Sequence, residues 1–234
     1  MNIESRVERL NTFIHEGRIV RHAWTGLDEQ GRETACLLAA LSPEAGEARA
    51  ACACPAAVMP GWFANLTPWM DDHGSEAEWH RTVRRYAACA ARWSILDNAA
   101  WRRVEIASRR ASVVEAMNHT IDERVLNVSR VVLAWLDEDM PEQSRDALWE
   151  TVVAVRASRP EASEAVSLVV AKKSGAAAAR AAARAVAREA REAAWVEAEA
   201  REAAWVEAEA RAEAAAADRI TNAILSALER ECGL

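Results

Sequence analysis

The ten residues from Arg191 to Ala200 are repeated without a change from Arg201 to Ala210, inside a tail dominated by alanine. Alanine supplies 23 of the 44 residues from Gly175 to Asp218, and nearly all of the others are Glu, Arg, Val or Trp. Because alanine has the highest helix propensity, this stretch can hardly form anything but helix. The sequence therefore predicts a helical globular domain over residues 1–173 and a long helical tail over residues 174–234.

The period of the repeat limits what the tail can form. Ten residues turn an ideal helix through about 1000°, so each copy is rotated by about 80° from the copy before it. Trp195 and Trp205 therefore do not line one straight seam, and the pattern does not predict a regular coiled coil. Near the end of the tail, Ile220, Ile224 and Leu228 recur every four residues and must pack on the chain's own domain or on a second copy. We expect a partner or oligomer interface formed by the two tryptophans of the repeat together with Ile220, Ile224 and Leu228. The competing interpretation is that the tail is a solvated spacer helix.

Local patterns in the first 173 residues favour helices. Ser75 with Glu78, and Thr120 with Glu123, match the capping box that begins a helix. Asp97 is a further candidate N-cap. After it, Trp101, Val104 and Val114 lie on one apolar stripe at helical spacing. Eight of the ten tryptophans precede Gly175, which gives this part large side chains for a core. The fold class predicted is all-α.

One segment near the N-terminus is ambiguous. Residues 3–16 have apolar side chains at helical spacing, and Gly17 is a natural stop. Residues 18–36 fit either a small β-hairpin or an extended segment followed by a helix over Glu33 to Leu41. We favour the extended segment followed by the helix and keep the hairpin as the alternative.

Charge and cysteine content bear on the cellular setting. The formal net charge of −7 argues against general attraction to nucleic acid or to an anionic membrane. The five cysteines are odd in number and irregularly spaced, which is typical of free thiols in a reducing compartment. The first residues are charged and resemble no secretory signal, and no apolar run approaches the roughly 20 residues of a membrane span. We expect a soluble, cytoplasmic protein.

An arginine cluster gives the first candidate binding site. Residues 81–110 contain eight arginines against only Asp97 and Glu105, a local charge of +6 in an acidic protein. Guanidinium groups hold phosphate or carboxylate in a forked geometry, so a nucleotide, nucleic acid or acidic partner could dock there. The alternative is that these arginines pair with the protein's own acids, including those of the tail. The candidate anion-binding residues are Arg81, Arg84, Arg85, Arg102, Arg103, Arg109 and Arg110.

A second, weaker candidate lies just before and within the helix that Ser75 caps. Asp71, Asp72 and His73 precede that helix, while Glu76 and His80 lie four residues apart on one of its faces. Carboxylate and imidazole ligands at such positions could hold a divalent metal, with Asp72, His73, Glu76 and His80 as the ligands. The alternative is that the acids stabilise the helix N-terminus and that His80 is a surface residue. No phosphate loop, dinucleotide fingerprint, nucleophile elbow or HExxH is present, and we predict no cofactor.

The middle and tail carry a resemblance. CPAAVMPGW from Cys54 to Trp62, LTPW from Leu66 to Trp69, the pair Asp71-Asp72, and a tail ending DRITNAILSALE resemble uncharacterised bacterial and phage proteins. Some toxin-immunity proteins have similar Ala/Trp-rich helical tails. The resemblance implies a small interaction protein in a phage, defence or toxin-immunity setting. Our first hypothesis is thus a non-enzymatic protein that self-associates or binds a protein partner through its C-terminal helix; anion binding and, more weakly, metal-dependent catalysis are the alternatives.

Overall fold

The structure is a computed structural model that describes residues 1–121, 123–136 and 202–234. Described residues form mostly helix with one two-stranded sheet, which confirms the predicted all-α class with a small hairpin. The first elements are α1 (Ile3–His15), β1 (Thr25–Leu27), β2 (Glu33–Ala35), α2 (Leu37–Leu41), α3 (Pro43–Ala48) and a 3₁₀ turn, η1 (Ala51–Ala53). They are followed by α4 (Gly61–Asp72), α5 (Glu76–Ala90), a second 3₁₀ turn η2 (Trp93–Ile95), α6 (Asn98–Asn118), α7 (Glu123–Leu136) and α11 (Glu202–Cys232).

The segment that was ambiguous in the sequence forms the hairpin. Strands β1 and β2 pair antiparallel, with Thr25 opposite Ala35. The favoured helix over Glu33 to Leu41 was therefore wrong in its first part, because Glu33 to Ala35 are strand and the helix begins only at Leu37. Its start is fixed from outside the segment, since the Asp71 carboxylate of α4 accepts a hydrogen bond from the Leu37 backbone N–H at 3.0 Å.

The starts of α5 and α6 agree with the capping residues predicted for them. Ser75 Oγ accepts a hydrogen bond from the Glu78 backbone N–H at 3.3 Å, and α5 follows it. Asp97 Oδ1 accepts from the Ala100 N–H at 2.7 Å at the start of α6. These bonds satisfy donors that a helix N-terminus otherwise leaves unpaired, so the two predicted N-caps are confirmed.

An aromatic cluster joins the helices in the centre of the core. Phe63 of α4 lies 6.1, 5.6 and 5.5 Å from the ring centroids of Tyr86, Trp93 and Trp101. Edge-on and stacked contacts of this kind add to the apolar area that the rings bury. The cluster fixes α4, α5, η2 and the start of α6 against one another.

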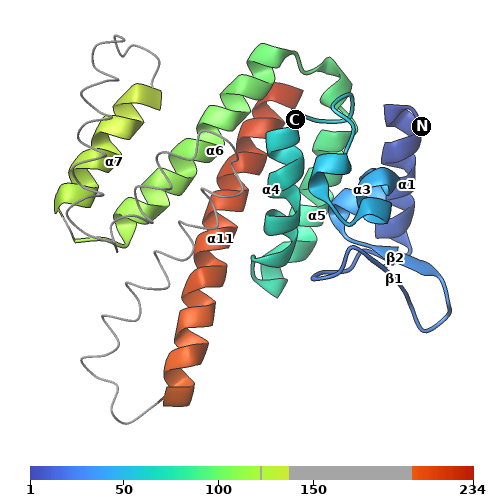
Figure 1. Ribbon diagram of the computed structural model, residues 1–234, viewed down its shortest axis with the longest axis horizontal. Coiled ribbons are helices and arrows are strands. Elements are labelled where there is room, and N and C mark those ends of the chain that lie inside the picture. Colours follow the sequence, from blue (N-terminus) through green and yellow to red (C-terminus); the bar gives the residue numbers. More distant parts are fainter. Residues whose placement is uncertain (122, 137–201) are drawn as a thin grey trace.

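The C-terminal helix is part of the same core. Figure 1 shows α11 running alongside α6, with α7 on the outer side of α6 and the N-terminal elements at the opposite end of the molecule. Helix α11 packs mainly on α6 and also on α5, and Ala217, Ile220 and Leu228 belong to the core cluster that includes α1 and α4. The expected boundary between residues 173 and 174 lies outside the described residues. The C-terminal part of the tail, however, packs into the same core as α5 and α6.

Candidate functional site

The apolar stripe at the end of the tail is covered by the chain's own helices. Ile220 is 1% exposed, and Ile224 and Leu228 are 0% exposed. The part of the expected partner interface formed by these three side chains is therefore corrected to an intramolecular contact with α5 and α6. Burial by a neighbouring helix satisfies the same hydrophobic demand that a second copy would have met. Trp195 lies outside the described residues, and Trp205 lies in α11 at a position where only the backbone is described.

One arginine of the sequence cluster fixes α11 to α5. Arg85 donates to both carboxylate oxygens of Glu229, at 2.6 and 2.8 Å. It also donates to Asn222 Oδ1 at 2.6 Å and to Ser226 Oγ at 2.8 Å. The three acceptors lie on successive turns of α11, so a single guanidinium spans the exposed edge of the helix contact. The same pairing lowers the pKa of Glu229, mainly through the hydrogen bonds from Arg85.

The last turns of α11 receive two further arginines. Arg103 of α6 forms a two-bond contact with the Glu231 carboxylate at 2.8 and 2.6 Å. Arg92, which follows α5, donates to the backbone carbonyl of Cys232 at 3.1 Å and to that of Gly233 at 3.3 Å. Cationic groups are favourable at a helix C-terminus because the last carbonyls carry partial negative charge. Arg92 and Arg103 therefore hold the end of α11 in place.

A fourth arginine contact joins α11 to α6 farther from the C-terminus, between Arg219 and Glu115. Glu115 of α6 is buried and accepts from Arg219 Nε of α11 at 2.9 Å, while His119 Nε2 lies 2.9 Å from the other Glu115 oxygen. Burial alone would raise the pKa of Glu115, but the hydrogen bonds and charge of Arg219 outweigh it and lower that pKa. Glu115 is therefore ionised at neutral pH and pairs with α11.

Helix α11 also contacts the loop between α4 and α5. Asp218 Oδ1 accepts from the Ser75 backbone N–H at 3.0 Å, at the start of α5. A Cβ atom on Gly74 would lie 2.6 Å from the same oxygen. A larger residue at position 74 would therefore have to displace the Asp218 carboxylate from this position.

The arginine cluster is largely used within the chain. Arg85 and Arg103 bind α11, Arg81 pairs with Glu78, and Arg102 and Arg109 pair with Glu105. Arg84 is exposed on α5, and Arg110 is half-buried on α6. The alternative interpretation, pairing with the protein's own acids and with the tail, describes most of the cluster. The acidic partners Glu229 and Glu231 were not singled out in the sequence, because nothing local connects residues more than 120 positions apart.

The proposed metal ligands do not form a binding group. Asp72 Oδ1 accepts from the His22 backbone N–H at 2.7 Å, and the His73 ring stacks on Trp69, with centroids 5.7 Å apart. Glu76 and His80 are both exposed on α5. Over residues 1–121, 123–136 and 202–234, no three His, Cys, Asp or Glu side chains converge as metal ligands do. Of these acids only Glu76 lies in the first turn of α5, as the alternative interpretation expects; Asp71 and Asp72 instead accept hydrogen bonds from other parts of the chain.

Asp71 serves as a buried structural acceptor. Its carboxylate is fully buried and accepts from Trp79 Nε1 at 2.7 Å as well as from the Leu37 N–H. Burial raises the pKa of Asp71 to about 6, although both hydrogen bonds favour the ionised form. The carboxylate therefore links α4, α2 and α5.

The cysteines are present as thiols. All five are free, and Cys36, Cys54, Cys89 and Cys232 are buried. Burial raises the pKa of Cys36 and of Cys89 to about 12, the direction opposite to the one that makes a cysteine nucleophilic. These side chains serve as small apolar groups in the core.

Neither the membrane-span search nor the comparisons with known proteins identify a function. No helix in the described ranges is both long and apolar enough to cross a membrane. No protein-family model, no curated protein and no solved structure matches the chain.

Proposed function

We propose that the chain is a non-enzymatic helical interaction protein whose tail binds a protein partner or a second copy of the chain. The observation that carries this proposal is the anchoring of the last turns of α11. Arg85, Arg92 and Arg103 all bind residues between Asn222 and Gly233. A solvated spacer helix needs no such attachment. A helix that presents a binding surface gains from it, because a fixed orientation lowers the entropy lost on association.

Docking of α11 moves the proposed contact surface toward the start of the tail. Ile220, Ile224 and Leu228 are occupied by α5 and α6, so a partner would meet the residues that precede Asp218. Within α11, Ala208, Ala210 and Arg211 are exposed. The repeat that carries Trp195 and Trp205 leads directly into this stretch, and tryptophan is among the residues enriched at the energetic centres of interfaces. The phage, defence or toxin-immunity setting implied by the resemblance belongs to the same proposal.

The chemistry of the buried polar groups supports binding over catalysis. Asp71 accepts two fixed hydrogen bonds inside the core, and the thiols of Cys36 and Cys89 are held protonated. Binding of an anion at the arginine cluster would have to displace the carboxylates of Glu229 and Glu231 from Arg85 and Arg103. We therefore propose no second function.

The experiment is sedimentation velocity of the untagged full-length chain from about 1 to 100 μM, a range that covers typical self-association affinities. We expect a dimer or larger assembly that the double variant Trp195→Ala with Trp205→Ala shifts toward monomer. The control, Glu197→Ala with Glu207→Ala, changes both copies of the repeat but keeps both tryptophans, and it should assemble like the parent. A parent chain that stays monomeric throughout would reject self-association and require a different protein as the partner.

A further inference from the structure

A groove on the opposite end of the molecule lies between α1 and the turn after α5. It has a volume of about 690 Å³, within the 300–1,000 Å³ typical of binding clefts. Ile3 and Val7 line it from α1, and Ala91 and Ser94 line it from the residues that follow α5. No described residue of α11 lines it, so the groove is distinct from the α11 contacts described above.

The floor of the groove is apolar. Ile3 and Val7 pack against the core on one side and remain partly exposed on the other, and Ala91 is exposed. Ile95, next to the groove residue Ser94 in the chain, is 66% exposed. A concave, solvent-exposed apolar surface of this kind favours an apolar side chain from another molecule.

The rim of the groove is acidic. Glu4 and Glu8 are exposed and lie one helical turn apart on α1, and the structure gives neither an ion pair with any described residue. Glu16 lines the groove at the other end of α1 and bonds Arg18 at 2.7 Å. No lysine or arginine of the described residues lines the groove. From Glu4 to Glu16 the groove follows α1 for roughly 18 Å, about three helical turns.

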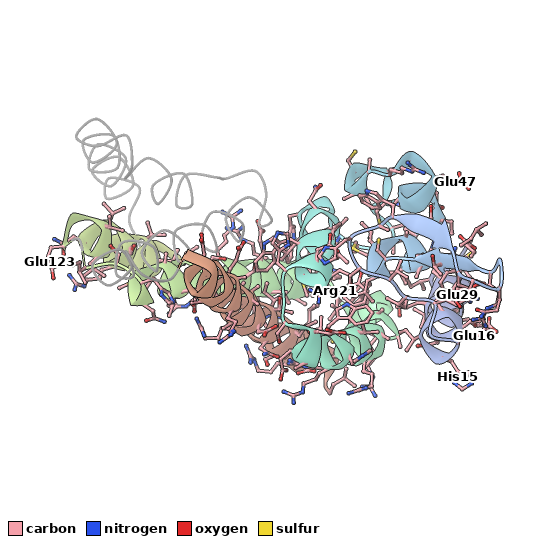
Figure 2. The ribbon with its side chains drawn as sticks, turned by 90° about the horizontal axis from the view of Figure 1, so that it is seen from below. His15, Glu16, Arg21, Glu29, Glu47 and Glu123 are labelled. Carbon is pink, nitrogen blue, oxygen red and sulfur yellow. The ribbon has the colours of Figure 1, made fainter. Side chains whose placement is uncertain are left out.

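We propose that this groove docks a basic amphipathic helix of a partner protein. Its apolar side chains would lie on Ile3, Val7 and Ala91, while lysine or arginine side chains would pair with Glu4 and Glu8. A helix that inserts its apolar face into a groove is a common mode of peptide recognition, and charge complementarity at the rim selects the partner and speeds association. Figure 2 shows His15 and Glu16 at the outer edge of the N-terminal part, with Glu47 on its far side. The groove is a second surface, and docking there does not depend on self-association through the tail.

The test is fluorescence anisotropy with the full-length chain and a fluorescein-labelled 14-residue helix of leucine and lysine, with leucine on one face. The groove variant is Glu4→Gln with Glu8→Gln. The control is Glu29→Gln with Glu47→Gln, which removes the same charge from exposed residues outside the groove. Loss of two ion pairs at about 0.7 kcal/mol each corresponds to a roughly tenfold weaker affinity. A second peptide with serine in place of leucine tests the apolar floor, and thermal melting confirms that each variant is folded.

We expect the groove variant to bind the leucine–lysine peptide about tenfold more weakly than the control variant, and the serine peptide to bind weakly to all variants. Binding should also weaken as salt is added, because the charges at the rim are exposed. The double variant Trp195→Ala with Trp205→Ala should bind the peptide as the parent does, which separates this inference from the proposed function of the tail. Equal affinities for the groove and control variants would show only general attraction to an acidic protein and would overturn the proposal.

Discussion

The packing of α11 makes a sharp prediction for Ile224→Ala. Ile224 of α11 is fully buried where this helix packs on α5 and α6, and the change removes three side-chain carbons. At about 0.8 kcal/mol for each buried methylene-sized group, the lost transfer free energy is roughly 2.4 kcal/mol. The cavity left behind adds to this, so we expect the free energy of unfolding to fall by about 3 kcal/mol. That is a large share of the roughly 5–15 kcal/mol that stabilises a typical domain.

The assay is urea unfolding followed by tryptophan fluorescence, at two protein concentrations about fiftyfold apart. Because the surface that covers Ile224 belongs to the same chain, the loss should be equal at both concentrations. If a second copy covered this side chain instead, the loss would depend on concentration by mass action. The control is Val114→Ala on α6, where the side chain is 43% exposed and the cost should be below about 0.5 kcal/mol. A concentration-dependent loss, or a cost for Ile224→Ala no larger than that of the control, would refute the docked arrangement of α11.

Three further changes test the polar contacts. Arg85→Ala should lower the free energy of unfolding by about 1–3 kcal/mol. A double-mutant cycle with Glu229→Ala should show that most of this loss is the interaction between the two side chains, because they are bonded to each other and only 19% and 27% exposed. Gly74→Ala should cost about 1–2 kcal/mol through its clash with Asp218, and urea titrations should show that Asp218→Ala removes most of that cost; an unchanged cost would place the strain elsewhere. Asp71→Asn should change how stability depends on pH. The folded-state pKa of Asp71 is raised to about 6, so this group's contribution is greatest at low pH and is lost as pH rises toward 6. Between pH 7 and pH 4.5 the parent should gain roughly 2 kcal/mol relative to the variant, and parallel slopes for the two proteins would contradict this.

Local signals in the sequence were sufficient for the all-α class and for the starts of α5 and α6. The hydroxyl of Ser75 and the carboxylate of Asp97 bond backbone groups only three residues away, so their role follows from the local sequence. The strand over Glu33 to Ala35 was harder, because its pairing with β1 competes with helix formation over the same residues. Which side chains of α6 are buried also depends on the helices that pack against it. Val113 is buried there, while Val114, on the predicted stripe, is 43% exposed.

The contacts of the tail show where sequence patterns stop being informative. Spacing alone predicted that Ile220, Ile224 and Leu228 share one face, and it left open which surface would cover that face. The answer depends on Arg85 and Arg103 meeting Glu229 and Glu231 across well over 100 residues of chain. An arginine cluster that would attract anions in isolation instead forms ion pairs with the acidic end of α11 in the folded chain. Positive charge on α5 and α6 and negative charge on the last turns of α11 therefore belong to one interaction. Any partner that competes for either half must first exceed the free energy that holds the two halves together.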